Sequence, residues 1–253
     1  MKRIDLNCDM GELAEAIADG TQESLMSSLT SVNIACGGHA GDEATMKATI
    51  EQALRHKLAI GAHPSYPDRT NFGRLELSMP MDAVANSVFE QVQALSTVAQ
   101  SYGALVTHVK PHGALYNQAA NNLELASSIA KGVGRWSREV VLVGLAGSRM
   151  LDVFSNAGFR IAAEAFADRR YESDGTLRPR KFSDALLTDP GEAAQQALRM
   201  VDQEKVIASD GSEIRVDAQT LCIHGDTPGA VQIAATVAQK LRQAGVMLSS
   251  LAR

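Results

Sequence analysis

Polar side chains that could carry out chemistry follow most of the short apolar runs of this chain. The first run leads to Asn7, Asp9 and Glu12, and the second leads to a glycine-rich segment that contains His39. A carboxylate such as Asp9 could act as a general base or bind a metal, while Glu12 could do the same or help to cap the next helix. Histidine can be a proton carrier, a metal ligand or a packed core residue, so His39 alone leaves these roles open.

The later apolar runs end in further titratable groups. His63 follows the third run, and Lys110 and His112 flank a proline after the fourth. That proline fixes the backbone, so one side chain could stabilise developing negative charge while the other moves a proton; alternatively, Lys110 pairs with a carboxylate. The sixth and seventh runs add Glu164, Asp168 and His224.

Two loop segments have compositions suited to anions. Residues 167–189 form a long polar segment with four arginines, whose guanidinium groups suit carboxylates or phosphoryl groups. We expect at most one of them, Arg178, to touch a substrate. Residues 37–41 offer backbone N–H groups next to glycines but lack the spacing of a nucleotide-binding loop.

Seven apolar runs, each of the length of a strand, alternate with segments of helical periodicity. The runs span residues 4–8, 32–36, 58–62, 105–109, 140–145, 160–166 and 220–223. Helices are expected over 43–56, from 80 to about 102, from 190 to about 202, and after 227–228. Such alternation requires crossover connections and therefore predicts a parallel sheet, either closed as a barrel or open. The carboxyl ends of parallel strands face one side, so the polar groups should share one pocket.

A single domain over residues 1–253 is expected, because α/β barrels of about 250 residues are common as one unit and no linker or repeat interrupts the pattern. Residues 205–217 alternate apolar and polar positions around a Ser-Asp-Gly-Ser turn. This alternation predicts a hairpin inserted before the last strand.

The composition narrows the classes of function. The chain is 45% hydrophobic and 21% charged, and its net charge of −5 is spread along the sequence, which disfavours nucleic acid as a partner. Cys8, Cys36 and Cys222 lack the spacing of a disulfide framework or a zinc ribbon, so reduced, buried thiols are expected. The first residues resemble neither a signal peptide nor a membrane span, so a soluble cytoplasmic protein is expected.

Six motifs together resemble the LamB/YcsF lactam-utilisation family, that of the A-type subunit of 5-oxoprolinase. They are DLNCDMGE at 5–12, NIACGGHAGD at 33–42, GAHPSYPD at 61–68, VKPHGALYN at 109–117, EAFADR at 164–169 and IHGD at 223–226. The resemblance covers residues 4 to about 248 in the order of the family.

The resemblance implies a seven-stranded parallel β/α barrel of TIM-like type, as in glycoside hydrolases and sugar deacetylases. It also implies ATP-dependent hydrolysis of the cyclic amide 5-oxoproline to glutamate, with Mg²⁺ and ATP used by two partner subunits of B and C type that activate the lactam. In such a reaction we expect Asp9 or His112 as the base and Lys110 as the partner of an oxyanion or phosphate. Substrate contacts are expected from Asn7, Glu12, His39, His63, Glu164, Asp168, Arg178 and His224.

Asn71 and Leu75 depart from the usual residues of the family. The related deacetylases hold a divalent metal through one Asp and two closely spaced His; this chain lacks such a His pair, but Asp9, His39 and His63 could converge on a metal. A stand-alone metal-dependent amidase or sugar deacetylase is therefore one alternative. A non-catalytic carrier for the partner subunits is another, and a homo-oligomer is compatible with either.

Overall fold

Seven parallel strands pair side by side until the last strand meets the first. The computed structural model describes residues 1–251. The strands are β1 (Arg3–Met10), β2 (Ser31–Ala35), β3 (Ala59–His63), β4 (Val106–Val109), β5 (Val141–Leu145), β6 (Arg160–Phe166) and β9 (Thr220–Cys222). Neighbours follow this order, and β9 pairs in parallel with both β6 and β1. The sheet is therefore a closed β/α barrel, which confirms the expected fold class.

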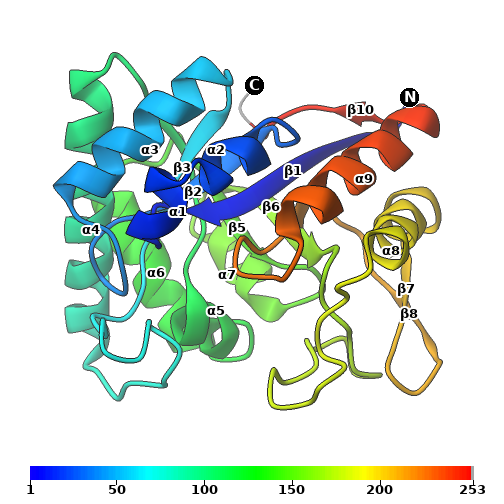
Figure 1. Ribbon diagram of the computed structural model, residues 1–253. Helices are drawn as coiled ribbons and strands as arrows, with labels where there is room; N and C mark the ends of the chain where they lie inside the picture. The colour runs from blue at the N-terminus through cyan, green and yellow to red at the C-terminus, as the bar shows by residue number, and fades with distance from the viewer. Residues whose placement is uncertain (252–253) are drawn as a thin grey trace.

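Helices cover the outside of the barrel (Figure 1). They are α1 (Ala14–Ala18), α2 (Thr21–Met26), α3 (Glu43–Arg55), α4 (Met81–Ser101), α5 (Gly113–Ala119), α6 (Leu123–Trp136), α7 (Arg149–Asn156), α8 (Pro190–Gln203) and α9 (Ala230–Gln243). Local signals explain where several begin. The side chain of Asp42 accepts a hydrogen bond from the backbone N–H of Thr45 in the first turn of α3, and Pro190 occupies the first position of α8.

The boundaries differ from the predictions by one to three residues, for physical reasons. Strand β1 continues to Met10 because Asp9 and Met10 pair with residues of β2, so Asp9 lies within the strand. Helix α9 begins at Ala230, after Gly229, whose φ of 78° is left-handed and therefore not helical.

The inside of the barrel is polar at several levels. Asp5 accepts hydrogen bonds from the hydroxyls of Ser31 and Thr220, at 2.9 and 2.6 Å. One level further along β1, the Asn7 side chain bonds to Glu164 and Thr220. Intervening residues of β1, Ile4, Leu6 and Cys8, belong instead to the apolar core. This alternation follows from the period of two in a strand, and it directs Asp9 towards the carboxyl end of the barrel.

Three short strands lie outside the closed barrel. β7 (Lys205–Ile207) and β8 (Glu213–Arg215) pair as an antiparallel hairpin, and β10 (Met247–Leu248) adds in parallel to the start of β1. Strand β10 is absent from the predicted elements because two residues carry no periodicity.

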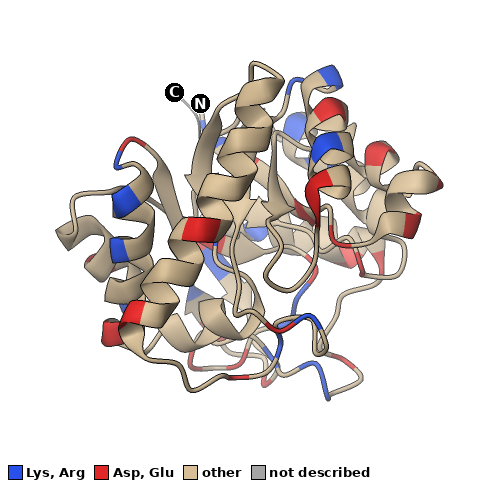
Figure 2. Ribbon diagram, turned by 90° about the vertical axis from the view of Figure 1, so that its left-hand side faces the viewer, with Lys and Arg blue, Asp and Glu red and all other residues tan. Residues whose placement is uncertain are grey.

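Charged residues of both signs share the surface. Basic and acidic residues are interspersed over the side of the molecule that Figure 2 shows. All three cysteines are free and buried. Within residues 1–251, every helix is too short or too polar to cross a bilayer.

Candidate active site

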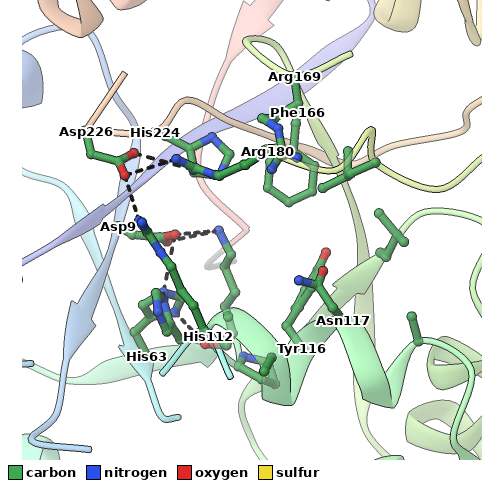
Figure 3. A pocket seen from close by; sticks show the side chains of 18 of the residues that line it. Asp9, His63, His112, Tyr116, Asn117, Phe166, Arg169, Arg180, His224 and Asp226 are labelled. Atoms are coloured by element: carbon green, nitrogen blue, oxygen red, sulfur yellow. Dashed lines mark hydrogen bonds and ion pairs between the residues drawn. The ribbon is translucent and has the colours of Figure 1, made fainter. Parts of the chain in front are cut away.

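A cavity of about 540 Å³ lies at the carboxyl ends of the barrel strands, in the size range typical of small-molecule sites. Figure 3 shows it from close by, with Asp9 between His63 and His112 on one side and His224 on the other. Six of the residues singled out from the sequence line the cavity: Asp9, Glu12, His63, Lys110, His112 and His224. These six residues come from four different strands and their loops and thus meet at one rim.

Asp9 is held in place by a relay of buried amide and imidazole groups. The side-chain amide of Asn33 on β2 donates to Asp9 Oδ1 at 2.9 Å, and His108 Nε2 on β4 donates to Asn33 Oδ1 at 2.9 Å. Burial lowers the pKa of His108 to about 3, so this imidazole is neutral and acts as a positioning group. Asn33 and His108 are strand residues whose role follows only from their place beside Asp9.

Lys110 is buried between two carboxylates. Its Nζ lies 2.9 Å from Asp9 Oδ1 and 2.9 Å from Glu164 Oε1, and Cys222 Sγ is 3.2 Å away. Burial alone would lower the pKa of Lys110, but the charges of Asp9 and Glu164 raise it well above its ordinary value. The charge of Lys110 is thus already paired with carboxylates, which was the alternative to a catalytic role for this residue. Glu164 and Asn7 do not line the cavity. Inside the barrel, Glu164 contacts Lys110 and accepts a hydrogen bond from the Asn7 side-chain amide.

The pKa values of the two carboxylates at the end of β1, Asp9 and Glu12, are shifted in opposite directions. Burial would raise the pKa of Asp9, but the nearby charges of His63 and Lys110 outweigh it and hold the pKa well below its ordinary value. For Glu12, burial is the largest effect, and the pKa is raised. Opposite shifts in one pocket are the arrangement that separates a proton acceptor from a proton donor.

Three histidines pack together beside these carboxylates. The rings of His39 and His112 stack at 3.6 Å, and His63 meets both edge-on. His39 Nε2 lies 2.8 Å from Glu12 Oε1. Burial, together with the other histidines, lowers the pKa of His39 to about 2 and of His112 to about 3. His39 does not line the cavity; its ring stacks on His112, which does.

The hydrogen bonds of His63 and His112 identify which ring nitrogens carry protons. A carbonyl oxygen only accepts, so His63 Nδ1 donates to the Lys110 carbonyl at 2.7 Å and His112 Nε2 donates to the Phe72 carbonyl at 2.9 Å. The remaining nitrogens, His63 Nε2 and His112 Nδ1, face each other at 2.9 Å. Asp9 Oδ2 lies 3.2 Å from the same His63 Nε2, so this pair of nitrogens faces the Asp9 carboxylate.

Glu12, His39, His63 and His112 also form a group that could hold a metal, with one ligand atom each within 4.8 Å of the others. Three nitrogens and one carboxylate oxygen suit zinc. At 2.9 Å, the facing nitrogens of His63 and His112 are closer than two ligands of a tetrahedral zinc, which bond lengths of about 2.05 Å place roughly 3.3 Å apart. The rings would therefore have to separate slightly. Asp9, grouped with His39 and His63 from the sequence, is not in this set.

His224 is oriented by a buried carboxylate on the opposite wall. Asp168 accepts from the backbone N–H of His224 at 2.9 Å, from its Nδ1 at 2.9 Å and from the Thr227 hydroxyl at 2.6 Å. The imidazole stacks on Phe166 with a centroid distance of 5.3 Å. Asp168 is fully buried and does not line the cavity, so it positions His224 instead of touching a ligand directly.

The arginines of the loop after β6 are placed differently from the expectation. Arg178 does not line the cavity; it pairs with Glu172 at 2.8 Å and Asp184 at 2.7 Å on the loop itself. Arg169 and Arg180 of the same loop line the cavity instead. The sequence showed the arginine cluster but not which members turn inward, because the loop has no periodicity.

A third arginine comes from the segment after β3. Arg74 and Arg180 both bind Asp226, at 2.7 and 3.1 Å, across the mouth of the cavity. Arg74 was not among the predicted site residues, although it follows the departure at Asn71. Its placement depends on Gly73 and Gly113: Gly113 has a φ of 56°, and a Cβ there would lie 2.4 Å from the Gly73 carbonyl oxygen.

Comparisons with known proteins agree over nearly the whole chain. The LamB/YcsF family is matched over residues 4–253. The chain is 45% identical over 250 residues to the A-type subunit of 5-oxoprolinase from Chloroflexus aurantiacus, covering 99% of both, and 46% identical over 248 residues to that of Heliobacterium modesticaldum, covering 98% of both.

Solved structures extend the comparison to the fold. A lactam utilization protein from Thermus thermophilus superimposes with a TM-score of 0.91 at 40% identity, covering 98% of this chain and 100% of that one. A family 4 carbohydrate esterase from Streptomyces lividans, in complex with acetate, shares the fold at a TM-score of 0.53 and 12% identity, covering 99% and 93%.

Proposed function

The chain belongs to the LamB/YcsF family, and we propose that it is the ring-opening subunit of an ATP-dependent 5-oxoprolinase. In this proposal it hydrolyses the lactam of 5-oxo-L-proline to L-glutamate after two partner subunits of B and C type have activated the lactam with ATP and Mg²⁺. The names of the relatives support the substrate. The observation that carries the chemistry is the pair of carboxylates with opposite pKa shifts in one pocket.

Opening a lactam requires two proton transfers. Water attacks the carbonyl carbon and loses a proton, and the ring nitrogen gains a proton as its bond to that carbon breaks. The phosphoryl group that activation placed on the carbonyl oxygen is released as phosphate when a second water hydrolyses the resulting acyl phosphate. Asp9, whose pKa is lowered, stays ionised and accepts the hydrogen bond of the attacking water. Glu12, whose pKa is raised, retains a proton more readily and donates it to the nitrogen. His112 Nδ1, 3.3 Å from Glu12 Oε1, lies where it can exchange that proton.

Lys110 has two roles in this proposal. It lines the cavity, so it remains the proposed partner of the oxyanion formed by water attack. It also keeps Asp9 ionised through the 2.9 Å contact of its Nζ with Asp9 Oδ1. His224 faces the same space from the opposite wall and is proposed to contact the ligand there.

The test combines this chain with the two partner subunits, ATP and 5-oxoproline and follows glutamate. Omitting each component in turn assigns the roles. Asp9→Asn and Glu12→Gln should each lower glutamate formation by roughly 100-fold or more, the usual effect of losing a general base or acid. Glu15→Gln, on the exposed surface of α1, is the matched control and should leave the rate unchanged. A wild-type rate in Glu12→Gln would refute the assignment of the donor.

A second candidate function, a metal-dependent amidase or deacetylase acting alone, is favoured by the cluster of Glu12, His39, His63 and His112. A zinc ion held there would act as a Lewis acid and lower the pKa of a bound water. Metal analysis of the purified chain tests this reading. Stoichiometric zinc or manganese, with chelator-sensitive activity that needs no ATP, would favour it over the 5-oxoprolinase.

A third reading, a carrier for the partner subunits, makes a different prediction. A carrier would bind 5-oxoproline, yet the complete mixture would form glutamate at the same rate with Asp9→Asn as with the wild type. Loss of turnover in that variant, with binding retained, would exclude it.

A further inference from the structure

The cationic groups of the cavity are distributed unevenly. Lys110, at the floor, is surrounded by Asp9 and Glu164, two carboxylates for one lysine. Glu12 adds a third acidic side chain to that side. A carboxylate that the ligand carries before the reaction begins would be repelled by Asp9 and Glu164 at this floor, so it binds elsewhere, whereas the oxyanion forms next to Lys110 only during the reaction.

The opposite wall has the reverse balance. Arg180 and Arg74 share a single carboxylate, that of Asp226, at 3.1 and 2.7 Å. Among residues 1–251, these two guanidinium groups thus have one carboxylate between them as an ion-pair partner. Arg169 adds another positive charge to the same wall.

Arg169 is the most unusual of these groups because it is only 7% exposed. Its Nη2 donates to the backbone carbonyl of Arg178 at 2.7 Å, but among residues 1–251 its Nε has no hydrogen-bond partner. Burial and then repulsion from Arg180 lower its pKa, and these two effects outweigh the opposing charges of Asp168 and Asp226. A buried guanidinium is costly unless an anion pairs with it.

We propose that Arg169 and Arg180 form an anion subsite that binds the carboxylate of a carboxylate-bearing lactam. The proposal rests on the function proposed above and adds to it the orientation of the ligand. In Figure 3, Arg169 and Arg180 lie with Phe166 and His224 on the side away from His63 and His112. With its carboxylate on the arginine wall, the ring extends towards Asp9 and Glu12, which act on the amide. A guanidinium fork matches the two oxygens of a carboxylate, and this match makes the subsite a determinant of specificity.

The experiment measures binding of three ring compounds to the full chain by calorimetry. They are 5-oxo-L-proline, 2-pyrrolidinone, which lacks the carboxylate, and cyclopentanecarboxylate, which lacks the lactam. In Arg169→Gln, both carboxylates should bind roughly 10-fold to 100-fold more weakly, as expected for loss of a charge-assisted hydrogen bond, while binding of 2-pyrrolidinone is unchanged. Arg170→Gln removes the neighbouring charge outside the cavity and should bind all three like the wild type.

A second variant, Arg180→Gln, tests the same subsite in case Arg169→Gln does not fold. The Arg180 side chain is 32% exposed, so Arg180→Gln should fold, and its carboxylate affinities should fall by roughly threefold or more. Inorganic phosphate is a further probe. If phosphate binding depends on Arg169 while 5-oxoproline binding does not, the subsite serves a phosphoryl group and the proposal is overturned.

The outcomes separate this proposal from the proposed function. Equal affinity of the wild type and the arginine variants for 5-oxoproline overturns the subsite even if the assembled subunits form glutamate. Arg169-dependent binding of cyclopentanecarboxylate supports the subsite even if no glutamate forms. Failure of the wild type to bind either carboxylate overturns it as well.

Discussion

Replacement of Lys110 by methionine tests whether the floor of the cavity is held together by its central charge. Methionine has a similar length and no charge, so the substitution removes the cation with little change in packing. Lys110 is 3% exposed and Glu164 is fully buried, so both Glu164 and Asp9 would be left without their shared partner.

The expected loss of stability in Lys110→Met follows from the burial of Lys110 and Glu164. Removing one partner of a buried ion pair costs about 3–5 kcal/mol, because an uncompensated charge stays in a low-dielectric environment. In a chain of 253 residues this corresponds to a fall in the melting temperature of roughly 6–20 °C. The pKa of Lys110 is raised, so its stabilising contribution is complete below the ordinary lysine pKa and is lost only as the pH rises through the higher folded-state value. A measurement at pH 7 therefore detects all of it.

Urea unfolding followed by circular dichroism gives the free energies for a double-mutant cycle. Lys110→Met, Glu164→Gln and the double variant are compared with the wild type. The double variant should be more stable than the sum of the single effects implies, by about 0.5–3 kcal/mol, because Glu164→Gln removes one of the stranded charges. Lys205→Met is the control: Lys205 pairs with Glu213 at 2.6 Å on an exposed hairpin and should cost at most about 1 kcal/mol.

Two results would refute this reasoning. One is a Lys110→Met protein as stable as the Lys205→Met control. The other is strict additivity of Lys110→Met and Glu164→Gln, which would mean that the two side chains do not interact despite their 2.9 Å contact.

Two further predictions concern acid stability and the space around the site. Asp168→Asn removes the carboxylate that binds His224. Burial would raise the pKa of Asp168, but the interactions with His224 and Thr227 lower it. The stabilising contribution of the Asp168 carboxylate is therefore present at neutral pH and is lost as the pH falls through the folded-state pKa. The difference in urea midpoint between wild type and variant should therefore shrink below about pH 4, and a constant difference from pH 7 to pH 3 would contradict this account. Gly61→Ala would place a Cβ 2.2 Å from His108 Nε2 and should destabilise the protein by about 1–3 kcal/mol, as overpacking does. Gly134→Ala, inside α6 with only ordinary contacts at 3.5 Å, should instead stabilise it by about 0.5–1 kcal/mol, so equal effects at the two glycines would disprove the steric argument.

The seven parallel strands and the side of the sheet that carries the polar groups could be predicted from the sequence. Apolar runs of the right length mark each barrel strand, and parallel pairing brings their carboxyl ends together whatever the loops do. His63, Lys110 and His224 were predicted to meet for this reason, and they line one cavity. Asp168 was also predicted as a site residue, but only the tertiary structure shows that it binds His224 and does not line the cavity.

The prediction of which arginines line the cavity was wrong, because contacts made by irregular segments place these side chains. The sequence of the loop after β6 favours Arg178 no less than Arg169 or Arg180, and the inward pair depends on how that loop folds back on itself through the bridge between Arg169 and Leu186. Arg74 is drawn to the site by the backbone contact between Gly73 and Gly113, two residues that are distant in the sequence.

The sequence by itself determined the seven βα units and the set of polar residues at one end of them, because periodicity and strand length are local properties of the chain. Only the tertiary structure decided the charge of each group in the pocket. Asp9 and Glu12 are three positions apart on the same segment, yet their pKa values shift in opposite directions. The reason is that Lys110 and His63, from other strands, surround the first, while burial dominates at the second, and neither effect exists until the barrel closes.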